Sequence, residues 1–129
     1  MAMPLRLSVV ESEFSVVRLS AGEDVPDWVD GDGAFTSITR TPDELSIVCG
    51  SDVVPEGLPI EGPWRAIKVQ GPIPMTLIGV IAAIADPLAD GGIAIFAIST
   101  FDTDYVLVHE QDLEAAIEIL HRAGHEISR

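Results

Sequence analysis

Two short segments of the chain carry residue types that could bind a small zwitterion between them. The first, 69–76, reads VQGPIPMT and connects a β-prone run to an expected helix. The first backbone N–H groups of a helix have no partner within the helix and attract anions, so a carboxylate would fit there. Gly71 allows a ligand to approach the backbone closely, and Pro72 and Pro74 stiffen the loop.

The second segment, 98–104, reads ISTFDTD and supplies hydrogen-bond acceptors. The Asp104 carboxylate, the hydroxyls of Ser99 and Thr100 and the carbonyls at the strand end could accept the protons of an ammonium group. A purely structural interpretation stays open. Gly-Pro is a common turn, threonine and phenylalanine pack readily at strand ends, and aspartates are frequent in turns.

The acids near this turn raise the question of a hard cation. They are Asp86, Asp90, Asp102 and Asp104. Their spacing lacks the alternating ligands and the glycine of a calcium loop, so we expect no metal site. His121 and His125 lie four residues apart without the glutamate of the HExxH pattern. We expect both on a solvated helix face near the chain end.

Catalytic signatures are missing from the sequence. Ser99 lies in a β-prone run and not at a GxSxG elbow, and no phosphate-binding glycine loop is present. We therefore expect no catalysis and no cofactor. An enzyme that uses Asp102, Asp104 or His109 would need these three side chains to converge in one cleft.

Composition limits the class of protein. The 129 residues suit one compact domain, or two small ones that share a core. Seven basic against 21 acidic residues give a formal charge of −14, so we expect neither nucleic acid nor membrane as a partner. Cys49, the single cysteine, lies in an apolar run and is expected to be a buried thiol. With no signal peptide or long apolar run, a cytoplasmic location is expected.

The spacing of apolar residues predicts the elements that position these segments. Leu113, Ala116, Ile117 and Leu120 fall at i, i+3, i+4 and i+7 and indicate a helix, which Gly124 would end. Pro and Gly mark 54–62 as a linker. The other expected elements are strands at 5–10, 14–19, 34–39, 45–49, 64–69, 93–98 and 105–108, and a helix at 75–88 with Leu77, Ile78, Ile81, Ile84 and Ala85 on its apolar side.

A weak internal repeat underlies this order. A shift of 60 residues superimposes the hydrophobic pattern of 38–53 on 98–113, and places the strand at 5–10 on the strand at 64–69. We interpret the chain as two copies of one unit. The first, residues 1–57, has lost most of its crossover helix to the loop 20–33, and the second, residues 58–129, is complete.

The second copy resembles an ACT domain, because Gly-Pro follows its first strand and ISTFDTDYVLV spans its hairpin. FTSITRTPDELSIVC in the first copy and the run 64–120 are similar to stand-alone tandem ACT proteins, to the ACT modules of cytosolic arginine sensors and to the regulatory end of aspartate kinases. The resemblance implies an α+β fold of two ferredoxin-like βαββαβ sandwiches, the first abbreviated, with antiparallel sheets and helices on one face. Residues 126–128, or a neighbouring copy, would have to supply the closing strand.

The resemblance also implies a function. It indicates a non-catalytic regulatory protein that binds an amino acid between ACT modules, with Thr100, Phe101 and Asp104 on the hairpin side. The residues expected to bind the ligand are Gly71, Pro72, Ile73, Met75, Thr76, Ser99, Thr100, Phe101 and Asp104. The expected partners are a small amino acid effector, a second copy in a homodimer and a regulated protein. The alternative is a protein–protein interaction module with a vestigial pocket that acts through oligomerisation.

Overall fold

The computed structural model describes residues 4–29 and 33–129 and contains two compact units. Unit 1 combines the N-terminal segment up to Glu11 with Arg65–Arg129, and unit 2 is Ser12–Trp64. The boundary lies within strand β5 (Ile60–Val69), which pairs in both units. None of the helices in the described ranges has the length and hydropathy of a membrane-spanning segment.

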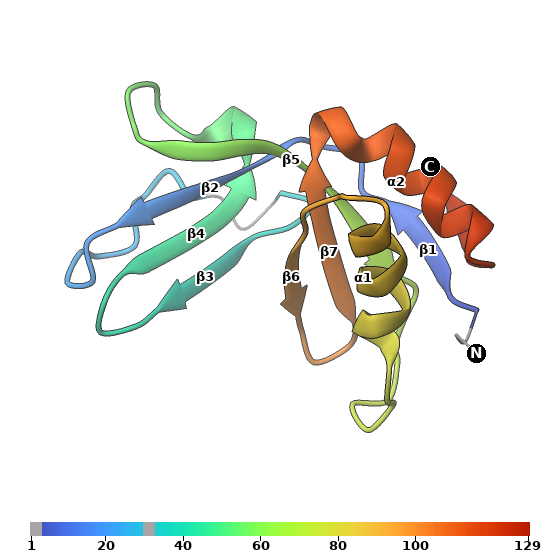
Figure 1. Cartoon of the computed structure of the whole chain (residues 1–129). Coiled ribbons are helices and arrows are strands. Elements are labelled where there is room, and N and C mark those ends of the chain that lie inside the picture. The colour runs from blue at the N-terminus through green and yellow to red at the C-terminus, as the bar shows by residue number, and fades with distance from the viewer. Residues whose placement is uncertain (1–3, 30–32) are drawn as a thin grey trace. The chain divides into compact units, whose positions relative to one another are not determined.

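Unit 1 is an α+β sandwich (Figure 1). Its sheet has the order β6-β7-β5-β1-β8, and helices α1 and α2 pack with it. The strands are β1 (Arg6–Val9), the end of β5, β6 (Phe96–Ser99), β7 (Asp104–His109) and β8 (Glu126–Ser128); the helices are α1 (Val80–Asp90) and α2 (Leu113–Arg122), which the short 3-10 helix η2 (Glu110–Asp112) precedes.

One face of this sheet and both helices enclose the core of unit 1. Alternate residues of the strands, such as Leu7, Ile67 and Val69, face the core, because successive side chains of a strand point to opposite sides. Leu113, Ala116 and Leu120 of α2 are buried as their spacing predicts. The predicted apolar face of α2 is therefore confirmed, and so is the expectation that this helix packs on a face of the sheet.

In unit 1, strand β1 from the N-terminal end of the chain pairs with β5, and strand β8 from the C-terminal end pairs with β1. Leu7 of β1 lies opposite Val69 in an antiparallel pair, and Ile127 of β8 lies opposite Leu7 in a parallel pair. Residues 126–128 do form a strand, but β1 takes the closing position and β8 adds outside it. The expectation of wholly antiparallel sheets is wrong for this one pair, because β8, which follows α2, runs in the same direction as β1.

His125 is buried, so the expectation of a solvated helix face is wrong for this residue. Only 2% of it is exposed, whereas His121 is exposed. Gly124, with φ of +99°, ends α2 and turns the chain inward, as expected for a glycine after a helix. The backbone N–H of Leu5 donates to Nδ1 of His125 at 3.0 Å, and Nε2 lies 2.9 Å from the carbonyl oxygen of Ala83. Because Nδ1 must accept, the ring is neutral and its proton is on Nε2, which donates to Ala83.

Unit 2 has the same strand order without the large helices. Strands β2 (Phe14–Leu19), β3 (Ser37–Arg40), β4 (Leu45–Gly50) and the start of β5 are arranged β3-β4-β2-β5, with the 3-10 helix η1 (Ser51–Val53) after β4. No α-helix occurs among the described residues of this unit. Its core contains Val17, Leu45, Ile47 and Cys49. An abbreviated ferredoxin-like copy is therefore present, as expected.

The internal repeat needs two corrections. Ser37 of β3 corresponds to Phe96 of β6, and Leu45 of β4 to Asp104 of β7, so the hairpins are related by a shift of 59 residues and not 60. A slip of one residue exchanges the two faces of a strand, so this register matters. The first strand of the first copy is β2, whereas the segment 5–10 belongs to unit 1.

The predicted boundaries of the two halves, 1–57 and 58–129, differ from the units of the structure in two places. Residues up to Glu11 pack with unit 1 because β1 pairs with β5 there. The expected linker 54–62 contains the first residues of β5, since Ile60 and Glu61 pair with Val17 and Val16. The assignment of the halves to an abbreviated and a complete ACT copy with those bounds stays a prediction.

Candidate ligand-binding site

The structure brings together the loop after β5 and the turn between β6 and β7. The backbone N–H of Ile73 donates to the carbonyl oxygen of Asp102 at 2.8 Å. A Cβ atom on Gly71 would lie 3.1 Å from that same oxygen and 3.1 Å from Cβ of Thr103. The absence of a side chain at Gly71 is what allows the two backbones to approach so closely.

Hydrogen bonds within the turn hold it in one conformation. The backbone N–H and the hydroxyl of Thr100 both donate to the carbonyl oxygen of Thr103, at 2.8 and 3.0 Å. The N–H of Thr103 donates in return to the Thr100 hydroxyl at 3.3 Å. The Thr103 hydroxyl donates to the carbonyl oxygen of Val69 at 2.5 Å, and Thr103 is 4% exposed. The turn is thus tied to the end of β5.

A cavity of about 160 Å³ lies between the loop and the turn. Six of the expected binding residues line it, namely Ile73, Met75, Ser99, Thr100, Phe101 and Asp104. Gly71, Pro72 and Thr76 are not among its lining residues, although Gly71 sets the position of the loop. Ligand binding by any of these residues stays a prediction.

Four residues of the lining were not in the expected set. Pro74, Leu77, Val80 and Thr103 complete it. Thr103 lies inside the segment ISTFDTD, but its role depends on a contact with Val69, 34 residues away. Nothing in the local sequence shows this contact.

The helix after the loop begins later than predicted. It was expected at 75–88, whereas α1 begins at Val80. Leu77 N–H closes a turn onto the carbonyl oxygen of Pro74 at 3.0 Å, and Gly79, with φ of +88°, precedes the helix. Met75 and Ile78 are consequently 74% and 91% exposed, and the expectation that Leu77 and Ile78 lie on the buried side of a helix is wrong.

The polar part of the cavity consists mainly of acceptors. Asp104 is the one residue of the lining with an ionisable side chain, and no lysine or arginine is among the described residues that line it. The hydroxyl protons of Thr100 and Thr103 are already donated to backbone carbonyls. The cavity therefore combines apolar walls with one carboxylate, an arrangement that suits an ammonium group attached to an apolar body.

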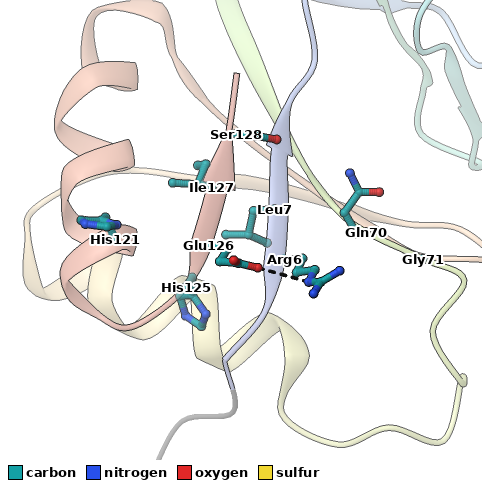
Figure 2. Close-up of a pocket in the computed structure, with 9 residues that line it drawn as sticks. All are labelled: Arg6, Leu7, Gln70, Gly71, His121, His125, Glu126, Ile127 and Ser128. Atoms are coloured by element: carbon teal, nitrogen blue, oxygen red, sulfur yellow. Dashed lines mark ion pairs between the residues drawn. The ribbon is translucent and has the colours of Figure 1, made fainter.

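A second, wider cavity of about 770 Å³ lies beside β8 (Figure 2). Figure 2 shows the ion pair between Arg6 of β1 and Glu126 of β8, whose atoms Nε and Oε2 are 3.1 Å apart. Both side chains are largely exposed, at 81% and 77%, so the pair contributes little to stability. His125 also lines this cavity, but both of its ring nitrogens already have partners.

Asp104 and His109, two of the three residues considered for catalysis, do not lie together. Asp104 and His109 occupy opposite ends of β7, roughly 16 Å apart at the usual rise of a strand. Within residues 4–29 and 33–129, no three side chains from His, Cys, Asp and Glu gather as they would around a metal ion. The acids considered for a cation, among them Asp86 and Asp90 on α1, thus form no such group there.

The fold and the cavity define a ferredoxin-like domain with a small cavity at one end of its sheet. The family model for the ACT domain matches residues 60–122, and a second model, described as an N-terminal domain, matches residues 12–57. Residues 60–122 therefore form an ACT domain, as the sequence predicted.

Known relatives agree with this assignment. Protein Atu0741 from Agrobacterium tumefaciens is 42% identical, with a TM-score of 0.91 over 99% of this chain and 96% of that one. The human protein named cytosolic arginine sensor for mTORC1 subunit 1 is 40% identical over 60 residues, which are 46% of this chain and 18% of the sensor. The regulatory subunit of aspartate kinase from Thermus flavus is similar in fold, with 13% identity and a TM-score of 0.60 over 95% of this chain and 97% of that subunit.

Proposed function

We propose that this protein is a non-catalytic regulator that binds a small amino acid in the cavity between the loop 71–77 and the turn 99–104. One observation carries the proposal. The two segments expected to form one site line one cavity, with Asp104 and the first residue of α1, Val80, in its wall.

Each charged group of an amino acid has a counterpart in this arrangement. The Asp104 carboxylate accepts the ammonium protons. The carboxylate of the ligand approaches the first turn of α1, where no side chain caps the N–H groups. The turn and loop are already hydrogen-bonded to each other, so the ligand meets a site that needs little ordering.

The open side of the cavity supports the proposal of a second subunit. Met75 and Phe101, which line the cavity, expose 74% and 80% of their surfaces. Apolar side chains gathered at the rim of a cavity are typical of a surface that another molecule covers. In the proposed homodimer a second copy covers this rim, so the ligand lies between subunits and shifts their association equilibrium.

The named activities of relatives extend the proposal to a regulated partner. One relative is a cytosolic arginine sensor for mTORC1, and another is a regulatory subunit of aspartate kinase. Because the chain spans 18% of the arginine sensor, the partner of that sensor does not transfer with the match. We propose a cytoplasmic amino acid sensor that regulates a partner protein different from that of the arginine sensor.

A second function is favoured by the edge of the sheet in unit 1. β8 ends the strand order, so its outer edge pairs with no other strand in the part of the chain described, and the wider cavity lies beside it. An exposed edge can accept a strand of another protein. An interaction module of this kind would form a stable complex or oligomer and would show no response to amino acids.

The experiment that separates the two functions is calorimetric titration of amino acids into the purified protein, with subunit mass followed by light scattering. Asp104→Asn should abolish the binding seen with the parent protein. Asp102→Asn is the matched control, because it removes the same charge from the same turn without belonging to the cavity wall. Equal binding by the Asp104→Asn variant and the parent would reject the site.

A further inference from the structure

We infer that the ligand of this cavity is an amino acid with a neutral aliphatic side chain and not a cationic one. The inference rests on the proposed function and adds the chemical class of the ligand. It follows from three properties of the cavity wall: the number of charged groups, the use of the available acceptors and donors, and the nature of the remaining surface.

The wall offers one carboxylate for one cation. Among the described residues that line the cavity, Asp104 alone is ionisable. In an amino acid with a neutral side chain, the α-ammonium group is the one cation, and it pairs with the Asp104 carboxylate. Arginine or lysine would bring a second cation into the same cavity, and its desolvation would have no second carboxylate to offset it.

The carbonyl oxygens nearest the turn already accept hydrogen bonds within the protein, and that of Thr103 is filled. The carbonyl oxygen of Thr103 accepts two hydrogen bonds from Thr100, which fills both of its lone pairs. The carbonyl oxygen of Asp102 accepts from Ile73, and that of Val69 accepts from the Thr103 hydroxyl. A guanidinium group with five N–H donors would therefore find few free acceptors at this end of the cavity.

Donors for an acidic or amide side chain are equally scarce. The hydroxyl protons of Thr100 and Thr103 are donated to backbone carbonyls, which leaves Ser99 as the one hydroxyl donor of the wall that is available among the described residues. No basic side chain of the described residues lines the cavity. A carboxylate or amide on the ligand side chain would lose its water without replacement.

The rest of the wall is apolar. It consists of Ile73, Pro74, Met75, Leu77, Val80 and Phe101. An aliphatic side chain gains affinity against such a surface, at about fourfold for each methylene group removed from water. Leucine, which has three more carbon atoms than alanine, should therefore bind on the order of 50-fold more tightly than alanine.

The net charge of the chain predicts the opposite preference and so makes the test informative. At −14, the protein attracts arginine and lysine from a distance, whatever the cavity holds. Titrations at about 0.15 M salt, where the Debye length is about 8 Å, suppress that attraction. A preference for aliphatic or for cationic amino acids that persists at this salt concentration is therefore due to the cavity itself.

The test is calorimetric titration of the whole chain with alanine, valine, leucine, isoleucine, methionine, arginine, lysine and glutamate. We expect affinity to rise from alanine through valine to leucine, with no binding of arginine, lysine or glutamate. Leu77→Ser should weaken leucine binding on the order of tenfold, because it replaces an isobutyl group of the wall by a hydroxymethyl group. Ile78→Ser is the matched control, since Ile78 lies next in the loop, is 91% exposed and is not part of the wall.

The outcomes distinguish the inference from the function on which it rests. Binding of arginine or lysine that Asp104→Asn abolishes, with no binding of aliphatic amino acids, would overturn the inference and keep the proposed sensor. No binding of any amino acid by the parent protein would overturn both. Aliphatic binding that Leu77→Ser and Ile78→Ser weaken equally would place the ligand outside this cavity and also overturn the inference.

Discussion

The backbone N–H of Ile73 donates a hydrogen bond to the carbonyl oxygen of Asp102 at 2.8 Å, and this bond joins the two segments that line the candidate site. Gly71 lies beside the same carbonyl oxygen, where a Cβ atom would approach it to 3.1 Å. The position of the loop is therefore set by the turn, and the cavity depends on a glycine that does not line it.

Gly71→Val should disturb both stability and binding. Its side chain would meet the backbone of Asp102 and Cβ of Thr103, so the loop must move, at a cost of about 1–3 kcal/mol in the free energy of unfolding. Urea unfolding measures this cost, and calorimetry should show that the response to amino acids is lost. In Gly22→Val, the control, a Cβ atom meets nothing within 4 Å. A Gly71→Val variant that binds as well as the parent would contradict the proposed geometry.

Thr103→Val should destabilise the protein although the two side chains have nearly the same shape. The variant keeps the packing of a residue that is 4% exposed but leaves the carbonyl oxygen of Val69 without the donor at 2.5 Å. We expect a loss of about 1–3 kcal/mol in urea unfolding. Thr39→Val, in an exposed position of β3, is the control and should change stability by less than about 0.5 kcal/mol. Equal effects of the two substitutions would show that the hydroxyl of Thr103 has no special role.

The ring of His125 connects three separate segments of unit 1, and His125→Leu should show its contribution. The variant leaves the Leu5 N–H and the Ala83 carbonyl oxygen buried without partners, at about 1–3 kcal/mol for each group. His121→Leu on the exposed side of α2 is the matched control and should be nearly neutral. Hydrogen exchange of Leu5 should also become faster in His125→Leu alone. Unchanged protection of that amide would contradict the hydrogen bond.

Cys49 should be unreactive in the folded protein and should make stability depend on pH in the alkaline range. Burial, followed by the negative charge of Asp52, raises the pKa of its thiol above the ordinary value of 9.0. The unfolded chain therefore releases the thiol proton at a lower pH than the folded chain does. The free energy of unfolding should fall as the pH rises through 9 and above, and Cys49→Ala should lessen this fall. Labelling with a thiol reagent at pH 8 should be slow until urea unfolds the protein.

Local patterns predicted the elements whose ends carry their own signals. The strand expected at 14–19 is β2, and the helix expected from Leu113 begins there, because alternation and the helical period are properties of neighbouring residues. The start of α1 was missed because the apolar run continues from Leu77 through Ile84 across Gly79. The left-handed conformation of Gly79, which ends the turn before the helix, leaves no trace in that pattern.

Contacts between distant residues account for what the sequence did not reveal. The pairing of β1 with β5 and the burial of His125 join segments that are more than 50 residues apart, and patterns of neighbouring residues do not report such contacts. The two sides of the candidate site were found because glycine, proline, threonine and aspartate have distinctive chemistry. The apolar wall formed by Leu77 and Val80 was not found, because its residues resemble those of any core.

The most direct test of the proposed function is a thermal-shift screen of the twenty amino acids on the purified protein. A ligand present at about a hundred times its dissociation constant adds roughly 2.7 kcal/mol to the free energy of unfolding, which for a chain of 129 residues raises the melting temperature on the order of 10 °C. The proposed function predicts such a shift for a few amino acids, lost in Asp104→Asn and retained in Asp102→Asn. No shift with any of the twenty, in a protein that forms a stable dimer, would contradict it and favour the interaction module.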